Sequence, residues 1–145
     1  MRIVLQRVKQ ASVSVDNAVV GKIDNGIVIF LGIHKNDTKQ KADYLIKKCL
    51  GLRIFSDAQQ KMNLSLLDVG GAVLIVSQFT LYGDCSKGNR PSFTEAAAPQ
   101  LGRELYDYFV ENMKVVCPEV ATGIFGTMMD VDLINDGPVT LILDA

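Results

Sequence analysis

The sequence is poor in the residue types that most hydrolytic enzymes use for chemistry. Its 145 residues include one histidine and no tryptophan. The histidine, His34, has no partner indicated elsewhere, so we expect a solvated loop residue and no Ser-His-Asp or Cys-His catalytic set. The three cysteines, Cys49, Cys85 and Cys117, are odd in number and lack paired metal-ligand spacing. They predict free thiols in a reduced cytoplasmic protein without a metal site.

Long hydrophobic runs and an excess of either charge are also missing. The longest apolar run, Ile27–Ile33, is too short to span a bilayer, and Met1–Arg7 reaches charge too soon for a signal peptide. The net charge of −1 argues against a broad DNA-binding face but is compatible with contact to a short single-stranded end. No glycine-rich phosphate loop is present. We therefore expect no cofactor, no membrane contact and no DNA partner.

Hydrophobic residues make up 48% of the chain, which suits one globular domain over residues 1–145. A three-stranded meander is expected over 3–33, with turns at Asp16–Asn17 and Asn25–Gly26. The predicted fold is α+β: a curved, barrel-like, mainly antiparallel sheet with two main helices packed on one side. Further strands are expected over 52–55, 72–76, 115–121, 128–134 and 139–143, and loops over 56–71 and 83–94. One helix is expected from an N-cap at Asp37–Thr38 to Gly51. A second helix is expected over 97–113, with Leu101, Leu105, Tyr108 and Phe109 along one face.

Polar side chains gather where the most apolar predicted strand ends. Ser77–Tyr82 directly follows strand 72–76, and most of its residues carry a hydroxyl or an amide. Strand ends are places where backbone amides and short polar side chains can be aimed at a ligand. The alternative is that the strand simply continues, with Ser77, Phe79 and Leu81 on one face.

A Gly-Pro step interrupts the last predicted strand, in the run Asn135–Thr140. Proline removes a ladder donor, glycine permits unusual backbone angles, and an X-Pro bond is the one that adopts cis at low cost. The step is compatible with an ordinary turn. It is equally suited to presenting the bare carbonyl oxygens of Gly137 and Pro138 to a ligand.

Arg7 is expected on the core-facing side of the first strand, together with Ile3, Leu5, Ala11 and Val13. A buried guanidinium needs acceptors, so Arg7 either clamps backbone carbonyls or an anion, or extends its head into water at the end of the sheet. Cys85 lies in a polar loop without an evident base, so we assign it no role.

Taken together, these segments resemble the D-aminoacyl-tRNA deacylase family of bacteria and eukaryotes. The resemblance covers essentially the whole chain and keeps the order of the motifs. It rests on Met1–Val8, Ala11–Val13, Leu52–Phe55, Lys61–Asn63, Ser77–Leu81, Asn89–Phe93 and Asn135–Thr140.

The resemblance implies a homodimer of barrel-like subunits with active sites at the subunit interface. It implies a carboxylic ester hydrolase that releases D-amino acids, or glycine mischarged on tRNA-Ala, from the 3′ end of tRNA while rejecting L-aminoacyl esters. Gly137 and Pro138 would form a cis peptide that reaches into the partner subunit's pocket, and Arg7 would hold it. Ser77, Gln78, Phe79 and Thr80 would line that pocket, and Phe125 would lie near the adenosine.

Such a substrate explains how hydrolysis proceeds without a catalytic triad. An aminoacyl ester is already activated, and the neighbouring ribose hydroxyl can orient water. The backbone amides near Phe79 and Thr80, assisted by Gln78, are the expected oxyanion donors. A nucleophilic Thr80 is the alternative within this reaction. Three other functions stay open: hydrolysis of a different activated ester, a non-catalytic RNA 3′-end-binding module that stacks bases on Phe79 and Phe125, and a structural dimer.

Overall fold

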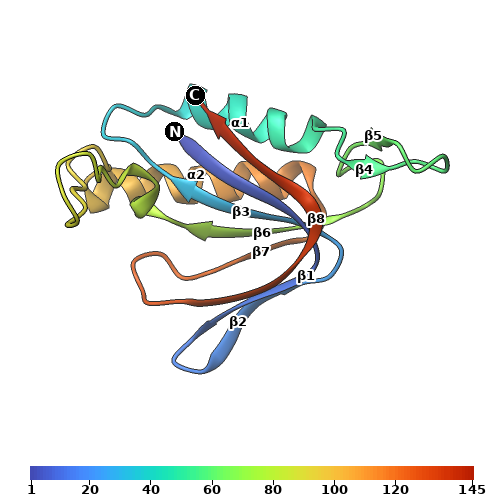
Figure 1. The fold of residues 1–145 in the computed structure, drawn as a ribbon, viewed down its shortest axis with the longest axis horizontal. Helices are drawn as coiled ribbons and strands as arrows, with labels where there is room; N and C mark the ends of the chain where they lie inside the picture. Colours follow the sequence, from blue (N-terminus) through green and yellow to red (C-terminus); the bar gives the residue numbers. More distant parts are fainter.

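The computed structural model describes residues 1–145 and shows a strongly curved sheet beside two helices (Figure 1). The elements follow in the order β1 (Arg2–Val15), β2 (Ala18–Ile23), β3 (Gly26–Gly32), α1 (Lys39–Gly51), β4 (Phe55–Ser56), β5 (Met62–Leu64), β6 (Ala72–Ser77), the 3₁₀ helix η1 (Phe79–Tyr82), α2 (Pro99–Val116), β7 (Val120–Thr122) and β8 (Asp130–Asp144).

β1 is the strand around which the sheet is built. Its first half pairs antiparallel with β3 and its second half with β2, while β8 runs antiparallel along its other edge. β6 and β7 then extend the sheet in parallel from β3. A Cβ added to Gly21 of β2 would lie 2.5 Å from the carbonyl oxygen of Thr122 in β7, so these two strands touch through their backbones. The sheet therefore closes almost into a barrel.

Both helices cover the same face of the sheet (Figure 1). Alternate residues of β3, such as Ile27 and Ile29, pack into the main core with the helices, whereas Val28 belongs to a second cluster inside the curve of the sheet. Because both faces are buried, β3 and β6 are nearly continuous apolar runs rather than alternating ones. The predicted barrel-like sheet with two helices on one side is confirmed.

Several predicted elements had the wrong bounds. The strands expected over 128–134 and 139–143 are one strand, β8, which continues through the Gly-Pro step. Residues 56–71 are not all loop, because β5 pairs with β4 in a short hairpin, and β4 begins at Phe55 rather than at Leu52. α2 runs on to Val116, so the strand expected from Val115 shrinks to β7. Val115 and Val116 are β-branched, but intrinsic propensity is a weak guide and the helix simply continues through them.

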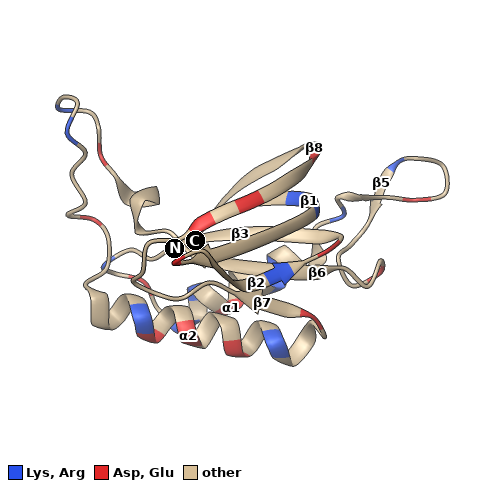
Figure 2. Ribbon diagram, turned by 90° about the horizontal axis from the view of Figure 1, so that it is seen from below, with Lys and Arg blue, Asp and Glu red and all other residues tan.

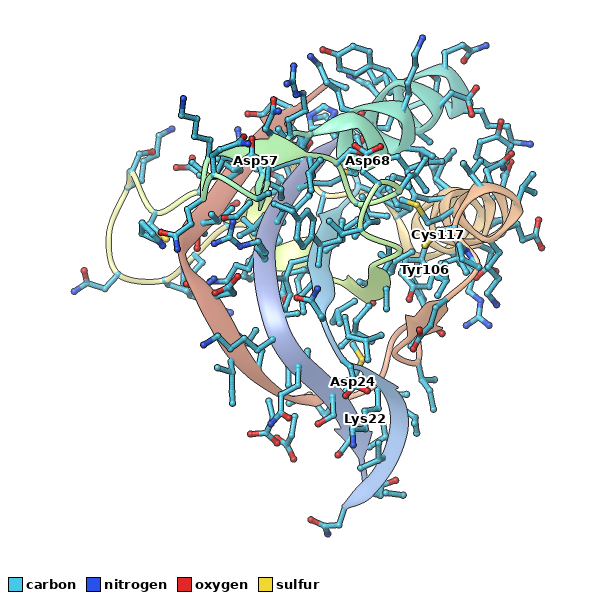
Figure 3. The ribbon with its side chains drawn as sticks, turned by 90° about the vertical axis from the view of Figure 1, so that its right-hand side faces the viewer. Lys22, Asp24, Asp57, Asp68, Tyr106 and Cys117 are labelled. Carbon is cyan, nitrogen blue, oxygen red and sulfur yellow. The ribbon has the colours of Figure 1, made fainter.

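Two details of the helices also differ from expectation. Thr38 occupies the N-cap position of α1 without a side-chain cap, and its neighbour Asp37 binds other groups, described below. In α2 the buried tyrosine is Tyr106, not Tyr108: it lies on the side that faces the sheet (Figure 3) and donates to the carbonyl of Ile75 at 3.0 Å. Burial raises the pKa of Tyr106 to about 12. Tyr108 instead donates to Asp43 at the surface.

Candidate active site

A pocket of about 340 Å³ opens where β3 and β6 end. These strands are parallel neighbours, so their carboxyl ends meet at one edge of the sheet, the place where parallel sheets commonly bind ligands. The first turn of α2 and the loop between β7 and β8 complete the walls. The lining residues are Leu31, Ile33, Ser77, Gln78, Phe79, Phe93, Ala96, Ala97, Pro99, Gly102, Phe125 and Gly126.

The polar segment after β6 turns away from the sheet instead of continuing it. The amide of Gln78 donates to the carbonyl of Leu31 at 2.8 Å, and the chain then enters η1. The alternative in which the strand continues through Tyr82 with alternating faces is therefore wrong, since β6 ends at Ser77. Phe79 and Thr80 are the first residues of η1, so their N–H groups have no acceptor within that turn.

Thr80 differs from its neighbours in where its side chain lies. Ser77, Gln78 and Phe79 line the pocket, whereas Thr80 does not. The side-chain amide of Gln78 donates to the Thr80 hydroxyl, and no histidine or carboxylate accepts the proton of that hydroxyl. The surroundings of Thr80 thus contain no base that would make it a nucleophile.

Aromatic rings form two walls of the pocket. Phe79 is 58% exposed and meets Phe93 edge to face, with ring centroids 5.0 Å apart. Phe125, from the loop between β7 and β8, has its ring centroid 5.6 Å from that of Tyr106, and a Cβ added to Gly102 would come within 3.3 Å of the Phe125 ring. Phe125 was predicted as a binding residue, and it does line the pocket. Phe93 and Gly102 were given no role, although an aromatic in the Asn89–Phe93 motif and a glycine inside a helix were the available signals.

The loop after β3 is tied to the segment that enters α2. The backbone amide of Lys35 donates to the backbone carbonyl of Glu95 at 3.1 Å, and the amide of Ala97 donates to the carbonyl of Ile33 at 2.9 Å. The Lys35 ammonium and the His34 ring both contact the Glu95 carboxylate, at 2.8 and 3.1 Å, and lower its pKa. His34 is consequently half-buried and paired rather than solvated, and it supports the pocket wall without lining it.

Asp37 anchors the loop after β3 through its buried side chain. Its side chain is fully buried and accepts from the Met1 ammonium at 2.6 Å, the His34 amide at 2.7 Å and the Lys41 ammonium at 3.0 Å. Burial alone would raise the pKa of Asp37, but these donors outweigh it and hold the pKa below its ordinary value.

The Gly137–Pro138 peptide is cis, as predicted, and both residues are exposed. Arg7 lies beside them with a side chain only 9% exposed. Its guanidinium contacts the Asp136 carboxylate at 2.7 Å and donates to the backbone carbonyls of Asp136 and Ile54. The guanidinium therefore binds carbonyls and a carboxylate instead of extending into water. Ile3 and Leu5 share its side of the sheet, but Ala11 and Val13 belong to the inner cluster, because β1 has one extra residue, Lys9, between the pairs Val8–Asn135 and Gln10–Ile134.

The two predicted motifs lie far apart within one chain. Arg7 pairs with Ile27 at the start of β3, whereas Leu31 at its end lines the pocket. Four residues of strand span about 13 Å. Neither Arg7 nor Gly137–Pro138 lines the pocket, so a single chain does not bring the two motifs together.

Other kinds of site find little support. No group of three or more histidine, cysteine, aspartate or glutamate side chains is arranged to hold a metal ion. Cys49 and Cys117 are buried, Cys85 is exposed, and all three are free thiols. Neither α-helix has the length and apolar character needed to cross a membrane. Along α2 three acidic residues lie between a basic residue near each end, so the helix carries both signs (Figure 2).

Residues 4–144 match the family described as D-Tyr-tRNA(Tyr) deacylase. A D-aminoacyl-tRNA deacylase of Thermosipho africanus is 55% identical over 145 residues, which is all of this chain and 97% of that protein. This chain belongs to the D-aminoacyl-tRNA deacylase family. It is an enzyme of that family, as the resemblance of its motifs predicted.

Two solved structures share the deacylase fold. A structure described as c-Myc DNA Unwinding Element Binding Protein superposes with a TM-score of 0.94 at 38% identity, covering 100% of this chain and 99% of that one. A probable eukaryotic D-amino acid tRNA deacylase gives a TM-score of 0.87 at 21% identity, covering 99% and 98%. The nearly closed barrel with two helices is therefore the architecture of this family.

Proposed function

We propose that this enzyme hydrolyses the ester between a D-amino acid and the 3′ end of tRNA, releasing the free amino acid and the tRNA. The observation that carries the proposal is the 55% identity over the whole chain to a deacylase so named. A single deacylase domain over residues 1–145 acts in this reaction, without a cofactor. Because charged tRNA is a cytoplasmic substrate, we place the enzyme in the cytoplasm.

The pocket at the ends of β3 and β6 is the proposed binding site for the aminoacylated end. Its aromatic walls suit a stacked adenine, with Phe125 and Phe79 as the candidate platforms. The N–H groups of Phe79 and Thr80, with Gln78, stabilise the oxyanion, a contribution on the order of 3 kcal/mol per donor. The free ribose hydroxyl of the substrate orients the attacking water, and no side-chain nucleophile is needed.

The working form is proposed to be a homodimer in which Gly137 and Pro138 of one subunit enter the pocket of the other. Three observations support this. The two exposed residues lie outside the pocket of their own chain, β8 has no partner along its outer edge, and Ile142 on this strand is 66% exposed. A second copy would cover β8 and complete the site.

Chiral selection follows from using backbone rather than side chains. A side-chain pocket discriminates poorly against a small added group, typically by a few kcal/mol. Carbonyls of Gly137 and Pro138 would accept the ammonium of the substrate and leave no room for an L side chain. Glycine, which has no side chain, would still enter, so we expect glycine mischarged on tRNA-Ala to be removed as well.

The test is hydrolysis of D-tyrosyl-tRNA against L-tyrosyl-tRNA by the wild type and by Thr80→Ala. We expect rapid loss of the D ester alone, and activity within about threefold of wild type in the variant, because the Thr80 hydroxyl has no base. A thousandfold loss, on the order expected for a missing nucleophile, would instead assign the attack to Thr80. Binding of charged tRNA without turnover would replace the enzyme by an RNA 3′-end-binding module.

A further inference from the structure

The ladder between β1 and β8 is broken by a wide bulge at the Gly-Pro step. Gln6 pairs with Thr140 and Val8 pairs with Asn135, so Arg7 alone faces four residues. We call these four, Asp136–Val139, the β8 bulge. Bulged residues lose their ladder partners, and their backbone groups need other ones. The direction in which Gly137 and Pro138 project therefore depends on what holds the bulge.

The side chain of Asn135 closes the neck of the β8 bulge. Its Nδ2 donates to the carbonyl of Arg7 on the facing strand at 2.9 Å and to the carbonyl of Val139 at 3.1 Å. Val139 is the last bulge residue and its side chain is buried in the main core. One carboxamide thus links the start of the bulge, its end and the neighbouring strand.

The oxygen of the same carboxamide, Asn135 Oδ1, lies close to Gly137 in the β8 bulge. A Cβ added to Gly137 would be 3.2 Å from Asn135 Oδ1, which is a close contact. Arg7 holds Asp136 on the far side, so the bulge is restrained at both ends while Gly137 and Pro138 stay exposed. The two restraints meet at one residue, because Asn135 binds the Arg7 carbonyl and Asp136 binds the Arg7 guanidinium.

Only an amide fits this position. Both groups facing Nδ2 are carbonyl acceptors, so the side chain must supply two donors from one nitrogen. Aspartate has the same shape but offers oxygen, which would repel both carbonyls. Glutamine keeps the donors but is one methylene longer and would push the neck open.

We propose that Asn135 is a positioning residue that sets the preference for D over L esters by fixing the direction of Gly137 and Pro138. The inference rests on the proposed function, since it assumes that these two residues sort the substrate. Asn135 itself does not line the pocket, so it acts through the bulge rather than on the reacting atoms.

The experiment compares Asn135→Asp with Asn112→Asp, measuring kcat/KM for D- and L-tyrosyl-tRNA together with the thermal midpoint. Asn112 is a matched control: its Nδ2 also donates to a backbone carbonyl, that of Tyr108, at 2.8 Å on α2, and it is half-buried as well. Losing two hydrogen bonds at the neck should lower the D-to-L ratio of kcat/KM by about tenfold or more. Asn112→Asp should leave this ratio unchanged even where its midpoint falls equally.

Asn135→Ala serves as a second variant, because it removes both donors without adding a charge. An unchanged D-to-L ratio in both Asn135 variants, with an active wild type, would overturn the positioning role and leave the proposed function standing. An equal loss of activity on both esters would overturn it as well, since that is damage to the site and not to its selectivity. A wild type that hydrolyses neither ester would overturn the proposed function and this inference together.

Discussion

The pocket and the β8 bulge are built in opposite ways. The pocket is a hollow with mainly apolar walls, in which η1 leaves N–H groups free and the rings of Phe79 and Phe125 remain accessible. The bulge projects outward, and a buried arginine and a carboxamide hold it at both ends. A surface that binds a developing negative charge needs free N–H donors, whereas the role proposed for the β8 bulge, the exclusion of one enantiomer, needs a fixed backbone. The chain keeps these two requirements about 13 Å apart along β3, so neither compromises the other.

The largest effect on stability is expected at Asp37, which anchors the loop beside the pocket. Asp37→Ala removes the buried counter-ion of the Met1 ammonium and should destabilise the fold by about 4 kcal/mol. Urea denaturation measures this difference. Asp43→Ala, which removes an exposed acceptor of the Tyr108 hydroxyl, should cost about 1 kcal/mol or less. Equal losses in the two variants would contradict the anchoring role of Asp37.

The same carboxylate gives the stability a dependence on pH. The pKa of Asp37 is lower in the folded protein than its ordinary value of 3.8, so its contribution is complete above that value. The contribution is lost as the pH falls through the lowered pKa. A steeper acid limb is therefore expected for the wild type than for Asp37→Ala, and parallel limbs would show that other carboxylates are responsible.

The second-largest effect is expected at the β8 bulge, which Arg7 holds in place. Arg7→Ala leaves two backbone carbonyls and the Asp136 carboxylate without their donor, and should cost about 3 kcal/mol together with most of the D-ester hydrolysis. Arg7→Lys should rescue little of this loss, because a single ammonium does not reproduce the guanidinium fork. Arg53→Ala is the control: it removes one exposed hydrogen bond, to the carbonyl of Asn63, and should cost about 1 kcal/mol or less. A stable and active Arg7→Ala variant would remove the contrast between the two regions.

The smallest effect separates binding from stability at the pocket. Gly102→Ala adds a methyl group 3.3 Å from the Phe125 ring, a pocket residue that must shift by a few tenths of an ångström to make room for it. We expect KM to rise roughly fivefold, equivalent to about 1 kcal/mol of overpacking, while the unfolding midpoint holds or rises because alanine favours helix. Gly51→Ala in α1, where nothing lies within 4 Å of the added methyl, should leave KM unchanged. A lowered midpoint with an unchanged KM would place the strain in the core.

The first hairpin and the buried arginine were predictable because their signals are local. Asp16 and Asn17 adopt positive φ angles of 50° and 64° in the predicted hairpin turn. The two-residue period of β1 placed Arg7 on the core side with Ile3 and Leu5. The period stopped being informative after Val8, because Lys9 is an extra residue between the pairs Val8–Asn135 and Gln10–Ile134 and moves every later side chain of β1 to the other face.

The parts that depend on distant contacts were not predictable. η1 forms where the ladder with β3 ends at Leu31, far away in the sequence. Gly102 lines the pocket only because the loop that carries Phe125 folds over α2. The bonds from Asn135 to Arg7 and Val139 require the register of β1 against β8, which nothing in the run Asn135–Thr140 reveals by itself.

The pairing of β1 with β8 also sets an order of assembly. Arg2 and Asp144 are joined although 142 positions separate them, and contacts between such distant segments are the slow ones to form. The strand that carries the β8 bulge therefore docks after the meander, the helices and the pocket walls have been synthesised. The element proposed to select the substrate is thus the one whose partner strand lies farthest away in the sequence, so the proposed selectivity depends on the longest-range strand pairing of the fold.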